Sequence, residues 1–254
     1  MIRIQSFSAG YGAGAFGIEI EDLTLKRGEI TTLIGENGCG KSTFLKSLAG
    51  ILPYRGHALM DGEEIADLSP KARAQRLAYL PQSLPAPRMT VRTLVSHGCF
   101  SRAGITNVLS EADLRGIETA LRETDMTPLS DRLLGKLSGG ERQRAYLAMI
   151  LAQDPDYLLV DEGTSSMDIA HQRKTMELFG RLTQRGKSVV TVSHDLPLSF
   201  SISSHIFIMK CGKVVLSGTP EKLAVQPERL REILGIALAP SRTDEALYAY
   251  ELIR

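Results

Sequence analysis

The sequence predicts an α/β fold with a mostly parallel sheet and an antiparallel β region ahead of it. Three features support this prediction. Short runs rich in aliphatic and β-branched residues alternate with helical stretches in the second half of the chain, as in a doubly wound sheet. A glycine-rich loop joins a buried strand to a helix. Residues 1–28 alternate apolar and polar side chains between glycines, which favours strands and hairpins.

The predicted strands follow from these patterns. In the N-terminal region the apolar positions are Ile2, Ile4, Ile18, Ile20, Leu23 and Leu25, and the interruptions are Gly10, Gly12, Gly14 and Gly28. HALMDGEEI (57–65) predicts another strand with an Asp-Gly turn. Buried core strands are predicted at ITTLIG (30–35), YLLVDE (157–162), KSVVTVSH (187–194) and HIFIMK (205–210).

The predicted helices lie between these strands. One runs from Ser42 to Ala49, directly after the glycine loop. The pattern is helical from about 89 to 153, where Ser110 and Asp113 form a capping-box signature. Leu114, Ile117 and Leu121 then recur at helical spacing, and Leu230, Ile233 and Leu234 predict a short helix near the end.

Composition excludes several classes of protein. The chain has 254 residues, of which 43% are hydrophobic and 23% charged, as in an ordinary globular protein. Its formal net charge of +1 favours no general binding to nucleic acid. It has neither an apolar run of membrane-spanning length nor a signal peptide. Cys39, Cys99 and Cys211 are odd in number and far apart, which argues against a disulfide framework and a zinc site and favours a reducing cytosol.

GENGCGKST (35–43) has the spacing of a phosphate-binding loop of P-loop nucleotide triphosphatases. Its backbone N–H groups from Gly38 to Thr43 would surround phosphate oxygens at a helix N-terminus. Lys41 would reach the β- and γ-phosphates, and the Ser42 hydroxyl would hold Mg²⁺. A glycine turn with a surface lysine is the alternative, which the strand–loop–helix setting disfavours. The predicted nucleotide-binding residues are Gly35, Asn37, Gly38, Cys39, Gly40, Lys41, Ser42 and Thr43.

YLLVDE ends in two carboxylates that suit the chemistry of such a site. Asp161, at the end of the strand, fits the magnesium contact of a Walker B motif. Glu162 is placed to polarise an attacking water as the general base. Acids at strand ends also cap the following helix, but the phosphate loop earlier in the chain favours the catalytic interpretation.

LSGGERQR (137–144) opens a second helix with glycines. Ser138 and Glu141 form a capping box, and Tyr146, Leu147, Ile150 and Leu151 would form the buried stripe of this helix. Capping does not explain two consecutive glycines, each of which costs a helix roughly 0.5–1 kcal/mol relative to alanine. They make sense if a ligand approaches the backbone closely. Without a lysine, this loop would be half of a nucleotide site.

LSGGERQR resembles the signature loop of ATP-binding cassette (ABC) ATPases, and the resemblance extends in order through nearly the whole chain. Tyr11 in SAGYGAG is similar to the aromatic residue that stacks on adenine. Gln82 in AYLPQ resembles the Q-loop glutamine that contacts Mg²⁺ and senses the γ-phosphate. DEGTSSMD resembles a Walker B motif continuing into a D-loop that ends at Asp168, and His194 in TVSHD resembles the switch histidine.

The resemblance implies a P-loop NTPase core with a mostly parallel sheet, an N-terminal antiparallel β region and a helical signature subdomain. Residues 1–254 are expected to form one ABC ATPase domain. Residues 1–88 and 151–254 would make the β region and nucleotide-binding core, and about 89–150 the helical subdomain. The implied cofactors are ATP and Mg²⁺, with the metal facing Ser42, Gln82 and Asp161. Glu162, His194 and Gln82 are the implied catalytic residues.

In this family two cassettes pack head to tail. Ser138, Gly139 and Gly140 of one copy would cap the ATP bound by the phosphate loop of the other, with Asp168 beside it. Each charge-assisted hydrogen bond could contribute roughly 1.5–3 kcal/mol, so several suffice to shift a dimer between open and closed states. Gly163 departs from the proline or alanine common in the family, and is expected to loosen the coupling of the two sites.

The chain lacks the coiled coils, second cassette and fused membrane span of other ABC proteins, which favours the separate ATPase subunit of a bacterial importer. Residues 60–82, 89–101 and 218–236 resemble the iron–siderophore, haem and cobalamin group. The implied partners are two permease subunits docking near 83–100 and, indirectly, an extracytoplasmic binding protein. The implied location is peripheral, on the cytoplasmic face of the plasma membrane.

One alternative to the importer subunit remains open, and a third function is disfavoured. A soluble accessory ATPase, for example in iron–sulfur cluster assembly, would use the same dimer to clamp a soluble scaffold. A regulator that only binds ATP is disfavoured by Glu162 and His194. The sequence does not identify the transported molecule, because an ATPase subunit does not contact it.

Overall fold

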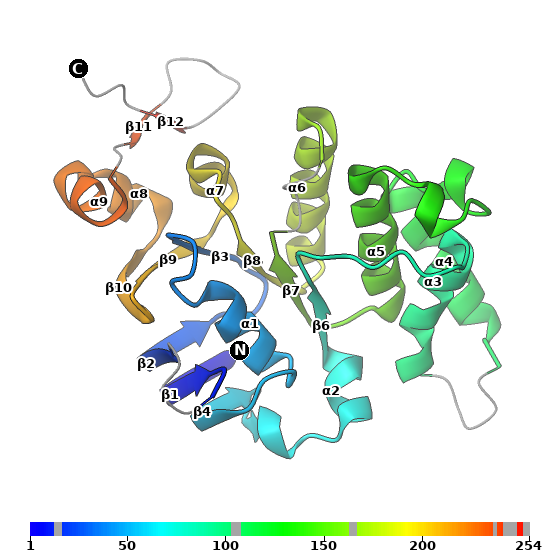
Figure 1. Cartoon of the computed structure of the whole chain (residues 1–254), viewed down its shortest axis with the longest axis horizontal. Helices are drawn as coiled ribbons and strands as arrows, with labels where there is room; N and C mark the ends of the chain where they lie inside the picture. Colours follow the sequence, from blue (N-terminus) through cyan, green and yellow to red (C-terminus); the bar gives the residue numbers. More distant parts are fainter. Residues whose placement is uncertain (13–16, 103–107, 163–166, 236–237, 241–247, 251–254) are drawn as a thin grey trace. The chain divides into compact units, whose positions relative to one another are not determined.

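The first strands form a four-stranded antiparallel sheet, as the alternating pattern predicts. In the computed structural model, which describes residues 1–12, 17–102, 108–162, 167–235, 238–240 and 248–250, the strand order is β2-β1-β4-β5 (Figure 1). The strands are β1 (Ile2–Gly10), β2 (Gly17–Leu25), β4 (Tyr54–Met60) and β5 (Glu63–Glu64). Asp61 and Gly62 have φ values of 52° and 95°, so the predicted Asp-Gly turn is confirmed.

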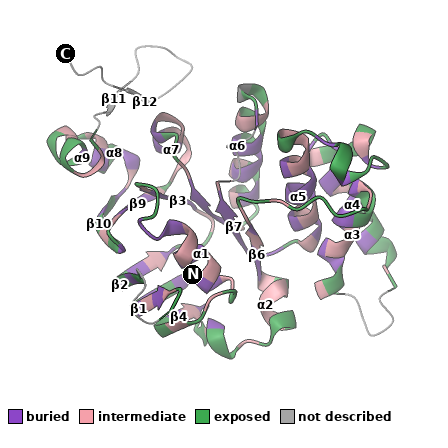
Figure 2. Ribbon diagram, in the orientation of Figure 1, coloured by how far each residue is buried: buried purple, intermediate pink, exposed green. Residues whose placement is uncertain are grey.

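Residues Met1–Asp67 and Ser188–Arg254 form one of two compact units. Besides the antiparallel sheet, this unit holds β3 (Ile30–Gly35), which pairs in parallel with β8 (Ser188–Val192) and with β9 (His205–Lys210). Strand β10 (Lys213–Gly218) pairs antiparallel with β9. The sheet is therefore mixed and mostly parallel, in agreement with the predicted fold class. Strands β3 and β8 are buried along almost their whole length because both of their faces are covered (Figure 2).

The helices of this unit are α1 (Lys41–Leu48), α7 (Leu196–Ile202), α8 (Pro220–Ala224) and α9 (Pro227–Leu234), with a 3₁₀ turn at Ile65–Asp67. Phe200 of α7 and Leu230 of α9 pack into one apolar cluster with Ile34, Ile206 and Ile208 of the sheet. The predicted terminal helix is thus confirmed. Two short strands, β11 (Leu238–Pro240) and β12 (Tyr248–Tyr250), pair antiparallel after it.

Residues Leu68–Lys187 form the second unit. Its parallel strand pair is β6 (Leu77–Leu80) with β7 (Tyr157–Asp161), and every residue of β7 is buried. Its helices are α2 (Pro70–Arg76), α3 (Val91–His97), α4 (Glu111–Glu123), α5 (Gly139–Gln153) and α6 (Ile169–Gln184), with 3₁₀ turns at Gly98–Ser101, Thr127–Leu129 and Leu134–Lys136. Helix α5 packs against both α3 and α4.

Both predicted capping boxes are present, at Ser110 of α4 and at Ser138 of α5. Two predicted apolar positions differ from the expectation. Leu114 is 52% exposed, whereas Ile117 and Leu121 of the same helix are buried. Leu151 is only half buried, whereas Tyr146, Leu147 and Ile150 are buried.

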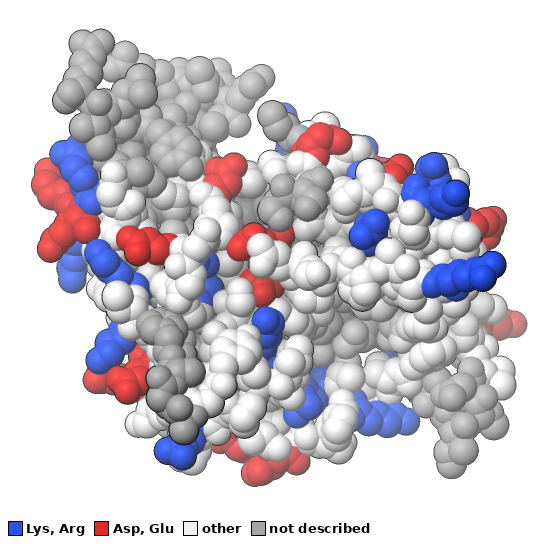
Figure 3. All heavy atoms as spheres, viewed as in Figure 1, with Lys and Arg blue, Asp and Glu red and all other residues white. Residues whose placement is uncertain are grey.

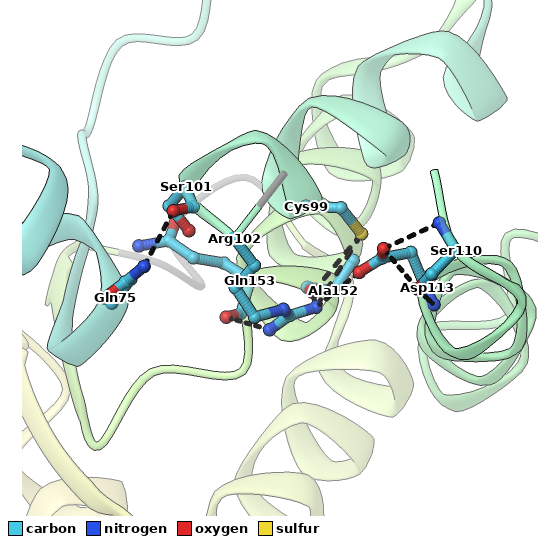
Figure 4. A network of polar contacts seen from close by, with 8 residues as sticks. All are labelled: Gln75, Cys99, Ser101, Arg102, Ser110, Asp113, Ala152 and Gln153. Atoms are coloured by element: carbon cyan, nitrogen blue, oxygen red, sulfur yellow. Dashed lines mark hydrogen bonds and ion pairs between the residues drawn. The ribbon is translucent and has the colours of Figure 1, made fainter. Parts of the chain in front are cut away.

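The C-terminal end of α5 is held by one arginine. Arg102 donates to the carbonyl oxygens of Ala152 at 2.7 Å and Gln153 at 2.6 Å, and its guanidinium also contacts Asp113 of α4 at 3.5 Å (Figure 4). These carbonyls lie in the last turn of the helix, where no further N–H is available from within it. Helix α5 is therefore fixed at one end by a capping box and at the other by Arg102.

Within the described part of the chain, no helix has the length and apolar character needed to cross a membrane.

Candidate active site

The phosphate loop begins where β3 ends. Gly35 has φ 153°, and a Cβ placed on it would lie 2.2 Å from the carbonyl oxygen of Met209 and 2.8 Å from the Sγ of Cys39, so only glycine fits. Gly40, at φ 107°, is the N-cap of α1 and has no side chain to cap it. The first N–H groups of a helix lack acceptors within the helix, and the helix dipole is positive at this end. The loop is therefore shaped to bind an anion.

Lys41 brings a positive charge to the middle of this loop. Its side chain is buried, and Nζ donates to the carbonyl oxygens of Gly35 at 2.7 Å and Glu36 at 2.9 Å. Nζ also lies 3.8 Å from the Sγ of Cys39, which is buried inside the loop. Phosphate oxygens are stronger acceptors for an ammonium group than neutral carbonyls, so a triphosphate can compete for this lysine.

The loop is also braced by the turn between β9 and β10. The N–H of Gly212 donates to the carbonyl oxygen of Cys39 at 3.1 Å, and the N–H of Glu19 in β2 donates to the carbonyl oxygen of Gly212 at 2.8 Å. Cys211, at φ 47°, is the other residue of this turn. One short turn thus contacts both the phosphate loop and the antiparallel sheet.

Tyr11 and His194 belong to the same unit as the phosphate loop. The Tyr11 ring is 60% exposed, and its hydroxyl accepts a 3.2 Å hydrogen bond from Nζ of Lys46 on α1. A flat aromatic face is therefore presented beside the helix that starts in the loop. His194 is exposed and follows β8, which runs parallel to β3. Since the carboxyl ends of parallel strands share one edge, His194 and Gly35 leave the sheet at the same edge.

The two carboxylates of YLLVDE belong to the second unit. Asp161 is 2% exposed at the end of β7, and its Oδ2 accepts a 2.9 Å hydrogen bond from the Tyr79 hydroxyl. Glu162 has φ 54°, in the left-handed region that residues with a side chain rarely adopt. Its carboxylate Oε2 accepts a 2.7 Å hydrogen bond from Nε2 of Gln82. The structure thus brings together Gln82 and Glu162, which lie far apart in the sequence.

The signature loop has the predicted capping geometry. The N–H of Glu141 donates to Oγ of Ser138 at 3.2 Å, and the N–H of Ser138 donates to the Glu141 carboxylate at 2.7 Å. This backbone hydrogen bond lowers the pKa of Glu141 below its usual value. Ser138 and Gly139 are exposed, and Gly140 is half buried. A hydroxyl that accepts one hydrogen bond can still donate another, so Ser138 can cap its helix and bind an anion together.

Asp168 is the N-cap of α6 and is exposed. Its carboxylate accepts from the N–H of His171 at 2.9 Å and contacts Nδ1 of the same residue at 2.8 Å. The hydrogen bond from the His171 backbone, followed by that from its ring, lowers the pKa of Asp168. His171 therefore orients the carboxylate of a predicted site residue. Gly163, whose effect on the coupling of the two sites was predicted, lies outside the described residues.

Several contacts at the site were not predicted from the sequence. Arg142 is half buried and donates to the carbonyl oxygens of Leu84 and Leu137. Tyr146, expected only in the apolar stripe, also donates to the carbonyl oxygen of Pro85 at 2.9 Å. Tyr79 and Gln143 were not singled out. Both lie inside segments that carry a predicted site residue, Tyr79 within AYLPQ and Gln143 within LSGGERQR, and this was the available signal.

The predicted residues therefore fall into two groups, one in each compact unit. The first unit holds Tyr11, the loop from Gly35 to Thr43, and His194. The second holds the carboxylates, Gln82, the signature loop and Asp168.

On the face drawn in Figure 3, basic and acidic side chains of the described residues are interspersed rather than gathered by sign.

A lysine-containing glycine loop between strand and helix, together with a buried strand-end aspartate followed by glutamate, defines a nucleotide triphosphatase of the phosphate-loop class. The family model described as ABC transporter matches residues 19–165. The probable siderophore transport system ATP-binding protein YusV of Bacillus subtilis is 39% identical over 225 residues, covering 87% of this chain and 82% of that protein. The iron(3+)-hydroxamate import ATP-binding protein FhuC of Bacillus subtilis is 36% identical over 260 residues, covering 100% and 96%.

The fold is also similar to that of a solved ATP-binding cassette. The dimeric post-hydrolysis state of the ATP-binding cassette MJ0796, bound to ADP and Pi, matches with a TM-score of 0.76 at 24% identity. The match covers 87% of this chain and 99% of that chain. This chain therefore belongs to the ABC transporter family, as an ATP-binding subunit that hydrolyses ATP.

Proposed function

We propose that this chain is the ATP-hydrolysing motor subunit of a bacterial ABC importer for an iron–siderophore or another metal chelate, such as haem or cobalamin. The observation that carries the proposal is the relationship to an iron(3+)-hydroxamate import protein over the full chain, at 36% identity. The likeness extends beyond residues 19–165, so it includes segments outside the nucleotide chemistry.

In the proposed site, Gly35, Asn37, Gly38, Cys39, Gly40, Lys41, Ser42 and Thr43 bind the triphosphate, and Tyr11 stacks on adenine. Lys41 exchanges its two carbonyl partners for phosphate oxygens. Glu162 accepts a proton from the attacking water as general base. Gln82, already bonded to that carboxylate, and His194 complete the catalytic group. Ser138, Gly139 and Gly140 cap the ATP of a second copy, with Asp168 beside it.

The donor set fits Mg²⁺. The metal prefers hard oxygen ligands, and Asp161, Ser42 and Gln82 supply a carboxylate, a hydroxyl and an amide oxygen. The Asp161 carboxylate is buried and oriented by the Tyr79 hydroxyl, as expected for a carboxylate that must keep a fixed direction. When bound, Mg²⁺ neutralises charge that develops on the phosphates.

We further propose a head-to-tail homodimer, two permease subunits docking near 83–100, and an extracytoplasmic binding protein that acts through them. The cassette would lie peripherally on the cytoplasmic face of the plasma membrane. Arg142 and Tyr146 of α5 donate hydrogen bonds to the carbonyl oxygens of Leu84 and Pro85. A permease that displaced residues 83–100 would therefore also displace the signature helix. Residues 1–88 and 151–254 as core, with about 89–150 as helical subdomain, remain our proposed functional division.

Purification distinguishes the importer from a soluble accessory ATPase, such as one for iron–sulfur cluster assembly. The tagged chain is expressed in its native cells, and membranes are extracted with mild detergent. The importer predicts co-purification with a polytopic membrane protein, and ATPase activity that rises when the complex is reconstituted with the chelate-loaded binding protein. A stable complex with a soluble scaffold in the absence of detergent, and none with membrane protein, would overturn the importer.

A further inference from the structure

Gln143 is a buried glutamine in the second turn of the signature helix α5. Its side chain is 3% exposed. A buried amide is costly unless its hydrogen-bonding groups are satisfied. The Nε2 of Gln143 is satisfied by one contact, a 3.0 Å hydrogen bond to the backbone carbonyl oxygen of Glu162. This side chain therefore joins the signature helix to the residue that follows β7.

The contact falls on a residue with an unfavourable backbone conformation. Glu162 has φ 54°, and such conformations persist only where the surroundings fix them. Gln143 holds the main chain of Glu162, while Gln82 holds its carboxylate at 2.7 Å. Two glutamines from different elements thus set the position and direction of the proposed general base.

The amide oxygen of Gln143 shows that the hydrogen bond donated by Nε2 is the contact that requires a glutamine. Its Oε1 is buried and meets no hydrogen-bond donor among the residues that the structure describes. An apolar side chain of similar size would avoid the desolvation of this oxygen, so packing alone does not favour glutamine here. The N–H donated to Glu162 is the feature that an apolar residue lacks.

We propose that Gln143 is a positioning residue, which holds the backbone of Glu162 and ties it to the signature helix of the same chain. Helix α5 is fixed at Ser138 by the capping box and at its last turn by Arg102 (Figure 4). Gln143 therefore lies on a helix whose two ends are both held, and which begins in the signature loop. The inference rests on the proposed function, in which Glu162 is the general base.

The test compares three single variants with the wild-type protein. Gln143→Met keeps the length of the side chain but has no donor. Gln143→Glu keeps the shape, and its carboxylate cannot donate, whereas its protonated form has an O–H that can. The matched control is Gln153→Met, since Gln153 lies on the same helix and donates to the backbone carbonyls of Ala74 and Leu77 instead. Steady-state ATP hydrolysis and ATP binding are measured for each.

Gln143→Met is expected to lower kcat by about 10- to 100-fold, as a small displacement of a catalytic group does, with KM for ATP changed by less than about twofold. Gln153→Met should keep the wild-type kcat. For Gln143→Glu, kcat divided by the wild-type kcat at the same pH should rise as pH falls, because protonation restores a donor. Arg142, Arg144 and Glu162 are present in both proteins, so the ratio compares two proteins that differ only in the side chain at position 143.

Glu162→Gln, measured in parallel, separates the two levels of the proposal. If Glu162→Gln abolishes turnover while Gln143→Met retains the wild-type kcat, the positioning role is wrong and the general base stands. If Glu162→Gln turns over normally, Glu162 is not the general base, and the part of the proposed function on which the positioning role rests is wrong. A Gln143→Glu to wild-type ratio that does not change with pH would also contradict the positioning role, even if Gln143→Met proved unstable.

Discussion

Nε2 of Gln82 donates a 2.7 Å hydrogen bond to Oε2 of Glu162. This contact joins the segment after β6 to the end of β7, whose strands are parallel neighbours. A carboxylate bonded in this way is held in one direction, which a general base needs.

Glu162→Gln is therefore expected to slow ATP turnover by about 10²–10⁴ while leaving ATP binding intact, because the amide cannot accept the proton of the attacking water. Stopped hydrolysis should also trap a closed dimer. The measurements are phosphate release and size-exclusion chromatography with ATP. Glu177→Gln, at an exposed ion pair with Arg173 on α6, is the control and should retain full activity. Equal activity of the two variants would exclude Glu162 as the base.

The two capping boxes allow the roles of Ser138 to be separated. Ser138→Ala and Ser110→Ala should each lower the free energy of unfolding by about 1 kcal/mol, because each removes the side-chain cap of one helix. Only Ser138→Ala should lower ATP hydrolysis, by about tenfold or more, if its hydroxyl also binds the γ-phosphate across the dimer. Urea unfolding and ATPase assays check both effects. A matching loss of activity in Ser110→Ala would show that the effect is only one of stability.

Glu141 makes part of the stability depend on pH. Its pKa is lowered in the folded protein, first by the hydrogen bond from the Ser138 backbone, so the unfolded chain binds the proton more readily. Stability from this group is present above the unfolded pKa and is lost as pH falls through the folded pKa. Glu141→Gln keeps a capping residue that does not titrate. Urea unfolding below about pH 5 should therefore show a smaller acid-induced loss for this variant than for wild type. Identical pH dependence would contradict this account.

Cys39 provides a chemical test of the phosphate loop. Its thiol is buried beside Lys41, whereas Cys211 is exposed. A thiol-blocking reagent should modify Cys211 quickly and Cys39 slowly, and the loss of ATPase activity should follow Cys39. Bound ATP should protect. In the Cys211→Ser variant inactivation should persist, and in Cys39→Ser it should disappear. Inactivation that ATP does not slow would argue against binding at this loop.

The sequence predicted the features whose signal is local. The apolar run 30–35 coincides with β3, and the serine–acid spacings at Ser110 and Ser138 mark real capping boxes. These patterns depend on neighbours within a few residues. The link from Gln143 to Glu162 could not be predicted, because it depends on α5 packing against the end of β7. The same holds for Tyr79, whose hydroxyl meets Asp161 only after the two strands pair.

The turn at Cys211 and Gly212 has a consequence for nucleotide choice. Gly212 bonds through its N–H to Cys39 in the phosphate loop and through its carbonyl to Glu19 in β2, the strand that pairs with the one leading to Tyr11. In the proposed complex, Tyr11 contacts the base and the phosphate loop contacts the phosphates. The turn at Gly212 thus supports both the sheet that leads to Tyr11 and the phosphate loop. A nucleobase that stacks poorly on Tyr11 would displace this turn and so misplace the triphosphate as well. Discrimination between nucleotides would then lower the rate of hydrolysis as much as the affinity.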